Sequence, residues 1–199
     1  MSSSADHPVA EPKPVTPIED DEHVLRKHVA FFDRNGDGLV YPWETFQGFR
    51  AIGCGILISI AGALVINPAF SKKTRPGGKF NILFPIGVHD IKFAIHGSDT
   101  GVFDSEGRFV PKKFEEIFAK HAKTNSVALT KDELSEMLSA NREPKDLPGR
   151  FAAFTEWKLL FHLCKDKNGL LQKETIKSFY DGNLFYKMEE ERKSIKKKP

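Results

Sequence analysis

The chain has 199 residues, of which 40% are hydrophobic and 29% are charged, and its formal net charge at pH 7 is +3. This length is sufficient for one hydrophobic core, or for a core divided between two lobes. A net charge this small does not indicate a nucleic-acid partner. The two cysteines, Cys54 and Cys164, form no disulfide framework and favour a reducing compartment.

Residues 1–20 form an acidic, proline-containing arm that we expect to be disordered, because it has too few apolar side chains to build a core. The arm also lacks the apolar stretch of a secretory signal peptide, since Met1-Ser-Ser-Ser leads directly into acidic residues and proline. We therefore expect the protein to face the cytosol.

Residues 33–44 have the spacing of a twelve-residue calcium loop, and residues 21–50 are predicted to form one calcium-binding EF-hand. Gly38 occupies the position of the sharp turn, where a Cβ would obstruct the chain. Val40 is expected to form a short strand that pairs with the loop of a second hand. The predicted calcium ligands are the side chains of Asp33, Asn35, Asp37 and Glu44, the carbonyl of Leu39, and a water at Tyr41.

The helix expected over about residues 21–32 places a histidine on its inward face. Positions 25, 28, 29 and 32 form one stripe at helical spacing, and His28 is the polar member of that stripe. From the residues alone, His28 is either a core histidine hydrogen-bonded to a backbone carbonyl, or a ligand of a metal or cofactor.

Residues 51–71 contain no charged side chain, and a basic cluster follows them at residues 72–79. About 20 apolar residues can cross a bilayer, but a single crossing would separate Val40 from every loop with which it could pair. A long straight helix is also weakened by Gly53, Gly55, Gly62 and Pro68. We therefore predict that residues 51–80 attach from one side to a membrane or lipid droplet. The alternative is a buried helix between two lobes.

Three later segments repeat the loop pattern without its full set of ligands, namely residues 102–113, 122–133 and 164–175. We predict that residues 81–187 form a domain of degenerate EF-hand-like units, in which the strand residues Leu129 and Leu171 belong to one pair. Residues 188–199 are expected to form a basic tail. The fold class is thus mainly α, with one intact calcium loop and an inserted hydrophobic segment. The predicted core consists of Phe114, Ile117, Phe118, Leu134, Leu138, Trp157, Leu160, Phe161, Phe179 and Phe185.

Several motifs along the chain occur together in one known family. They include His28-Val-Ala-Phe-Phe-Asp33, Tyr41-Pro-x-Glu44, His96-Gly-Ser-Asp99 and Glu156-Trp157. In this combination the chain resembles the plant caleosins, the peroxygenase family of lipid bodies and microsomes, from about residue 21 to residue 187. The chain departs from that family at residues 71–85, where two widely spaced prolines replace a proline-dense knot. Attachment to microsomes and attachment to droplets therefore both stay open.

The resemblance implies a calcium-dependent enzyme with haem b. Its reaction would transfer oxygen from a fatty-acid hydroperoxide to an unsaturated fatty acid or to another apolar substrate. The resemblance also implies a phospholipid monolayer or bilayer as partner, at the cytosolic face of the endoplasmic reticulum or of a lipid droplet. The alternative is a calcium-binding docking protein of the same surfaces, without catalysis. The oligomeric state is open.

Two histidines that the caleosin family uses for haem binding and catalysis fall on His28 and His96 in this sequence. If both bound haem iron permanently, a hydroperoxide would have no coordination position. Either one histidine therefore dissociates during turnover, or one is the proximal ligand and the other a distal acid and base. We favour His28 as the proximal ligand, because the calcium loop fixes its helix.

Overall fold

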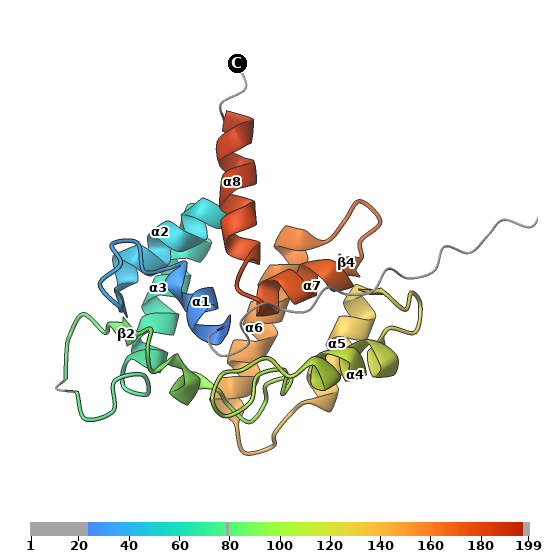
Figure 1. The fold of residues 1–199 in the computed structure, drawn as a ribbon, viewed down its shortest axis with the longest axis horizontal. Coiled ribbons are helices and arrows are strands. Elements are labelled where there is room, and N and C mark those ends of the chain that lie inside the picture. The colour runs from blue at the N-terminus through green and yellow to red at the C-terminus, as the bar shows by residue number, and fades with distance from the viewer. Residues whose placement is uncertain (1–23, 79, 197–199) are drawn as a thin grey trace, which may run out of the picture.

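The computed structural model describes residues 24–78 and 80–196, which form a mainly α-helical fold (Figure 1). The predicted arm of residues 1–20 lies outside the described residues, as do residues 21–23 of the first predicted helix. The α-helices of the described part are α1 (Val24–Ala30), α2 (Pro42–Ile52), α3 (Ile56–Ser71), α4 (Pro111–His121), α5 (Lys131–Ala140), α6 (Leu147–Cys164), α7 (Lys173–Tyr180) and α8 (Leu184–Lys196). The shorter elements are β1 (Leu39–Val40), β2 (Ile86–Gly87), the 3₁₀-helix η2 (Ile91–Ala94), β3 (Ala128–Leu129) and β4 (Leu171–Gln172).

Strands β1 and β2 join two helix–loop–helix units, which we call the N-terminal pair. The first unit contains α1, loop 33–44 and α2, and the second contains α3, β2 and η2. The strands are antiparallel, with Val40 opposite Ile86. The prediction that Val40 pairs with a second loop is confirmed. However, the partner is none of the three predicted degenerate loops. It is the segment around Ile86, where Phe84 stands at the position that Gly38 occupies in loop 33–44.

The hydrophobic stretch is divided between two helices. Gly53 ends α2 in the left-handed conformation, with a φ of 110°, and α3 then leads into β2. Helix α3 is one-sided, since Ser59, Asn67 and Ser71 are buried while several large apolar side chains face outward. Helices α2 and α3 lie against each other (Figure 1). Within the described residues, none of the helices combines the length and the apolar composition that crossing a bilayer requires.

The buried amide of Asn67 connects α3 to the rest of the N-terminal pair. Its Nδ2 donates hydrogen bonds to the carbonyl of Val40, at 2.8 Å, and to that of Phe84, at 3.1 Å. Its Oδ1 accepts a hydrogen bond of 2.7 Å from the Thr45 hydroxyl. One side chain therefore holds together β1, α2 and the approach to β2, which explains why a polar residue occurs inside the apolar stretch.

Strands β3 and β4 join the other two units, which we call the C-terminal pair. It contains α4, loop 122–133 and α5, followed by α6, loop 164–175 and α7. Leu129 lies opposite Leu171 in antiparallel register, as predicted. The main hydrophobic core belongs to this pair. Of the predicted core residues, eight are buried, while Leu138 and Phe185 are partly buried against the same helices.

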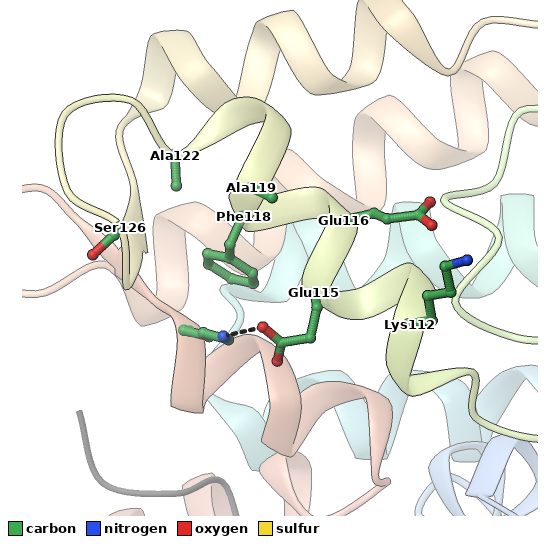
Figure 2. Close-up of a pocket in the computed structure, with 8 residues that line it drawn as sticks. Lys112, Glu115, Glu116, Phe118, Ala119, Ala122 and Ser126 are labelled. Carbon is green, nitrogen blue, oxygen red and sulfur yellow. Dashed lines mark hydrogen bonds and ion pairs between the residues drawn. The ribbon is translucent and has the colours of Figure 1, made fainter. Parts of the chain in front are cut away.

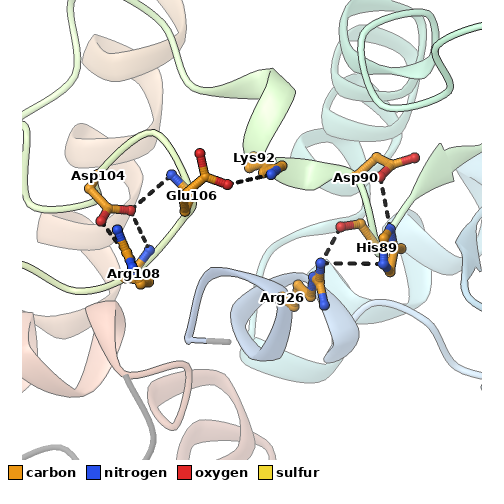
Figure 3. Close-up of polar contacts among 7 residues, drawn as sticks. All are labelled: Arg26, His89, Asp90, Lys92, Asp104, Glu106 and Arg108. Carbon is orange, nitrogen blue, oxygen red and sulfur yellow. Dashed lines mark hydrogen bonds and ion pairs between the residues drawn. The ribbon is translucent and has the colours of Figure 1, made fainter. Parts of the chain in front are cut away.

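The segment of residues 102–113 was predicted as a degenerate pairing loop, and this prediction is wrong. Phe103 and Phe109 bridge each other instead, so the segment closes on itself as a turn. The turn contacts the N-terminal pair, where Lys92 of η2 forms an ion pair with Glu106 (Figure 3). Gly107 lies so close to Leu25 of α1 that an added Cβ would stand 3.3 Å from it. The segment thus connects the two pairs.

Helix α8 includes residues 188–196 of the predicted basic tail and extends away from the other helices (Figure 1). Its base is fixed to loop 33–44, because the Arg34 guanidinium forms an ion pair of 2.8 Å with Glu189. This contact places the C-terminal helix beside the predicted calcium site.

Candidate functional site

The start of loop 33–44 is folded around the carboxylate of Asp33. Its Oδ1 accepts hydrogen bonds from the amides of Gly36 and Asp37, at 2.8 and 3.1 Å, and its Oδ2 accepts one from Gly38 at 2.8 Å. Gly36 and Gly38 have φ values of 75° and 83°, which a side chain would disfavour. Asn35 donates to the Asp37 carboxylate. The oxygens at the first three ligand positions thus lie along one exposed turn.

The end of the loop is closed by Glu44, which is only 2% exposed. Its Oε1 accepts from the amides of Arg34 and Asn35, and its Oε2 accepts from the amide of Tyr41 at 2.9 Å. The Leu39 amide donates to Asp37, and the Tyr41 ring stacks on Trp43 at 4.5 Å.

The donor set of this loop suits calcium, because it consists of carboxylate, amide and carbonyl oxygens. In the described part of the chain, however, no three His, Cys, Asp or Glu side chains converge closely enough to hold a metal ion. The carboxylates of Asp33 and Glu44 accept hydrogen bonds from the loop's own amides instead. Calcium binding would therefore require the carboxylate oxygens of Asp33 and Glu44 to reorient toward one common point.

Loop 122–133 is closed by a glutamate in the same manner. Glu133 accepts hydrogen bonds from the amides of Thr124 and Thr130, at 2.6 and 2.8 Å. Burial alone would raise the pKa of this carboxyl, but these hydrogen bonds outweigh it and lower the pKa to about 2. Because Glu133 is then ionised and bonded, this loop is closed without a cation.

His28 projects from α1 into the space between α7 and α8. Its Nδ1 lies 3.2 Å from the carbonyl oxygen of Phe179, which can only accept, so Nδ1 is the protonated nitrogen. The ring packs against Phe179 and Phe185, at 4.6 and 4.8 Å between centroids. Burial lowers the pKa of His28 to about 4, so the ring is neutral at pH 7. Its Nε2 therefore has a free lone pair, as a metal ligand requires.

His96 lies in the connection between η2 and the turn at residues 102–113. Its Nδ1 is buried and has no hydrogen-bond partner among the residues that the structure describes. The nearest charged atom is Oδ2 of Asp146, at 3.5 Å. Burial opposes ionisation of Asp146, but hydrogen bonds from the amides of Gly149 and Ser98 outweigh it and lower the pKa of Asp146.

The two predicted haem histidines do not share a contact. His28 contacts residues of α7 and α8, whereas His96 faces the N-terminus of α6. The structure thus gives each predicted histidine a defined environment. It does not bring the two rings into one contact cluster.

Sequence reasoning missed a group of acidic and hydroxyl side chains between α6 and α7. The Tyr180 hydroxyl lies 2.6 Å from that of Thr100, whose amide donates to Asp99. Burial raises the pKa of Tyr180 well above its ordinary value, and the Asp99 charge adds to this. One signal was present in the sequence, since Glu156 is the acidic residue of the apolar segment that becomes α6.

The Glu156 side chain is exposed, yet many protein atoms surround its carboxyl group. Burial among the surrounding protein atoms, together with the negative charge of Asp99, raises the pKa of its carboxyl to about 7. The residue as a whole nevertheless keeps contact with solvent. Because solvent weakens the effect of the surrounding atoms on an exposed carboxyl, we assign Glu156 no role in proton exchange.

A hollow beside α4 lies apart from all of these residues (Figure 2). Half of its lining residues are charged, and Glu115 and Lys173 among them are joined by an ion pair of 2.7 Å. A lining of this kind does not suit an apolar substrate, so we do not assign the hollow to the candidate site.

Comparison with known proteins identifies the family. A family model described as "Caleosin related protein" matches residues 20–189. The chain is 58% identical over 184 residues to probable peroxygenase 4 of Arabidopsis thaliana, which covers 92% of this chain and 94% of that protein. It is 48% identical over 171 residues to the peroxygenase of Lilium longiflorum, which covers 86% of this chain and 72% of that protein.

A third relative is the probable inactive peroxygenase-like protein of Arabidopsis thaliana, with 43% identity over 148 residues, 74% of this chain and 71% of that protein. No solved structure matches the chain. The family model extends over most of the chain, including both histidines and loop 33–44. The first two relatives also match most of the chain. The chain therefore belongs to the caleosin family of plant peroxygenases.

Proposed function

We propose that this protein is a calcium-dependent haem peroxygenase of fatty-acid metabolism that acts at a lipid surface. The reaction transfers one oxygen atom from a fatty-acid hydroperoxide to an unsaturated fatty acid or another apolar acceptor. The hydroperoxide leaves as the corresponding alcohol, and the alkene becomes an epoxide, so atoms and electrons balance. The observation that carries the proposal is the state of His28, whose ring is neutral, oriented by the Phe179 carbonyl and unprotonated at Nε2.

The environment of His28 fits a haem ligand. An imidazole that donates Nδ1–H to a carbonyl has its tautomer and orientation fixed, and it presents Nε2 for coordination. The flanking rings of Phe179 and Phe185 supply an apolar wall. Haem, when bound, supplies the redox chemistry that cleaves the O–O bond of the hydroperoxide.

His96 is the second histidine of the proposal, with a role in moving a proton. Its Nε2 would take the proton of the hydroperoxide and return it to the departing alkoxide. For this role, a protein group must contact the ring at Nδ1, so that Nε2 remains available for the proton. The Asp146 carboxylate, 3.5 Å from Nδ1, lies on that side.

Calcium dependence follows, in this proposal, from an EF-hand formed by α1, loop 33–44 and α2. Asp33 stands three residues after the last residue of α1. Calcium would draw Asp33 and Glu44 toward one ion. Ordering of the loop would then fix α1, and with it the position of His28.

The proposed lipid surface is the outward face of α3. Leu57 and Leu64 on this helix are 82% and 68% exposed, and Lys72 and Lys73 follow directly. Exposed apolar side chains beside cations are the composition of a surface that inserts into one leaflet. We propose attachment at the cytosolic face of the endoplasmic reticulum or of a lipid droplet. The exposed apolar residues of α3 are Ile56, Leu57, Ile58, Ile60, Leu64 and Val65.

The alternative function is a calcium-binding docking protein of lipid surfaces without catalysis. The same exposed face of α3 supports this alternative, because it needs no haem. One relative is named a probable inactive peroxygenase-like protein, and this name supports considering a function without catalysis.

Absorption spectroscopy separates the two functions. The purified protein is titrated with haem, with and without calcium, and compared with a His28→Val variant. We expect a Soret band in the wild type that the variant loses, while calcium binding measured by calorimetry stays unchanged. His162→Val is the matched control, since His162 is exposed on α6. A wild-type protein that remains colourless would favour the docking function, and a His28→Val protein that keeps the Soret band would contradict the assignment of His28.

A further inference from the structure

The His96 ring has a buried edge without a hydrogen bond. Its Nδ1 is enclosed by protein and, within residues 24–78 and 80–196, has no partner at hydrogen-bonding geometry. Buried polar atoms in native proteins almost always have such a partner, so an unpaired one requires an explanation. The Asp146 carboxylate oxygen at 3.5 Å is too distant for a good hydrogen bond, but it is the anion that Nδ1 faces.

The Asp146 carboxylate is fixed where it stands. Its Oδ1 accepts a hydrogen bond of 2.9 Å from the amide of Gly149, which caps α6. Its Oδ2 accepts one of 3.0 Å from the amide of Ser98, two residues beyond His96. The same carboxylate therefore begins a helix and holds the segment that carries His96.

A second contact ties the same two segments together. The Glu143 amide donates to the Ser98 hydroxyl at 3.3 Å. Gly97 allows this close approach, because an added Cβ would lie only 3.3 Å from Cγ of Glu143. The neighbours of His96 therefore hold it against the N-terminus of α6. Its ring lies beside the Asp146 carboxylate, which makes one of these contacts.

We propose that Asp146 is a positioning residue for His96, with its carboxylate accepting the Nδ1 proton once a small shift of either side chain closes the gap. Such carboxylate–histidine pairs fix the tautomer and the orientation of the ring. The pair leaves Nε2 of His96 unprotonated and able to receive a proton from substrate. A residue that served only as a helix cap would have no effect on this tautomer.

The tautomer can be measured directly by ¹⁵N NMR of the histidine rings in the full-length protein without haem. We expect His96 to carry its proton on Nδ1 at pH 8 in the wild type. Asp146→Asn should lose that preference, because the amide keeps the cap but removes the anion. His96→Gln assigns the signals. Asp166→Asn is the matched control, since Asp166 also accepts amides of its own loop, at the far end of α6.

Two results would overturn the proposal. One is a wild-type His96 that carries its proton on Nε2, and the other is an Asp146→Asn protein with the wild-type tautomer. If circular dichroism shows that Asp146→Asn does not fold, Asp146→Ser takes its place. The serine side chain keeps an oxygen that can cap the helix but is too short to reach the ring, and the same criteria apply. The wild-type measurement needs no variant.

The role of this pair in catalysis rests on the proposed function, but the NMR test of the tautomer does not. If haem fails to bind, the proposed function fails while the tautomer result still stands. If haem binds normally and His96 has the other tautomer, the present inference and the proton-transfer role of His96 fail, while the haem assignment stands. In the haem-loaded enzyme we expect Asp146→Asn to reduce kcat about tenfold or more with little change in KM, and an unchanged kcat would contradict the pair.

Discussion

Loop 33–44 and loop 122–133 share one backbone plan but differ in what they offer to an ion. Both end in a buried glutamate that accepts hydrogen bonds from amides of its own loop. At the first three ligand positions, loop 33–44 has Asp, Asn and Asp, whereas loop 122–133 has Ala, Thr and Ser. The comparison teaches that closing such a loop requires only the glutamate, while binding an ion requires the exposed oxygens at its start.

The N-terminal and C-terminal pairs also differ in how far they bury their apolar side chains. The C-terminal pair buries its strands in the main core, where Leu129 and Leu171 are fully enclosed. The N-terminal pair has a smaller core around Val40 and Ile86, and its helix α3 faces outward with apolar side chains. We interpret the C-terminal pair as the stable scaffold and the N-terminal pair as the part that responds to calcium and lipid.

Removing a strand leucine from the scaffold should have the largest effect. Leu171→Ala leaves a cavity in the main core and should lower the free energy of unfolding by about 2–5 kcal/mol. Val40→Ala is the counterpart in the N-terminal pair and should cost less, because it removes one carbon fewer from a smaller cluster. Urea denaturation measures both. A larger loss for Val40→Ala would reverse the assignment of the scaffold.

Removing the Asn67 amide should have the next largest effect. Asn67→Ala leaves the carbonyls of Val40 and Phe84 without their donor, at about 1–3 kcal/mol for each buried group left unpaired. The loss should be accompanied by weaker calcium binding, because β1 belongs to loop 33–44. Ser59→Ala is the control, since Ser59 is equally buried on α3 but bonds only the Gly55 carbonyl just before its own helix. Equal effects of the two substitutions on stability and calcium binding would contradict this account of Asn67.

The two closing glutamates should separate calcium binding from stability. Glu44→Gln should weaken calcium binding about tenfold or more, equivalent to about 1.4 kcal/mol, because one charged ligand is lost. Glu133→Gln should leave calcium affinity unchanged and lower only the melting temperature. Titration calorimetry and thermal denaturation measure the two effects. A calcium affinity that falls with Glu133→Gln would show that the second loop also binds an ion.

The smallest expected effect is a pH dependence from Glu156 of α6, where burial and the negative charge of Asp99 act on the carboxyl. Its carboxyl has a pKa of about 7 in the folded protein against an ordinary value of 4.5. The folded state therefore binds more protons between these values, so this group's contribution to stability falls as the pH rises from 4.5 to 7. Glu156→Gln should match the wild-type melting temperature below pH 4.5 and exceed it at pH 8. A difference that is constant with pH would contradict the raised pKa.

Much of the scaffold could be predicted from local patterns. The constrained positions of loop 33–44 are close in sequence, and the Leu129–Leu171 pairing follows from two loops with the same internal register. The partner of Val40 was missed, because Phe84 stands two residues before Ile86, where loop 33–44 has its turn glycine Gly38. The segment at residues 102–113 misled the prediction, since Gly107 and Phe109 also suit a simple turn.

The candidate site was predictable only in part. Helical spacing singled out His28 and allowed for a bond to a backbone carbonyl, whereas His96 and the haem role of both histidines came from a resemblance. The identity of their partners was not predicted. The Phe179 carbonyl and the Asp146 carboxylate are far from them along the chain and meet them only through tertiary packing. The grouping of Asp99, Glu156 and Tyr180 depends in the same way on how α6 and α7 pack.

Oxygen transfer from the hydroperoxide is the central claim, and isotope labelling tests it most directly. The haem-loaded protein is incubated with calcium, a fatty-acid hydroperoxide labelled with ¹⁸O in both peroxide oxygens, and an unlabelled unsaturated fatty acid. Mass spectrometry should find one ¹⁸O atom in the epoxide and the other in the alcohol derived from the hydroperoxide. An epoxide without the label, or no epoxide formed by protein that has bound haem, would contradict the account.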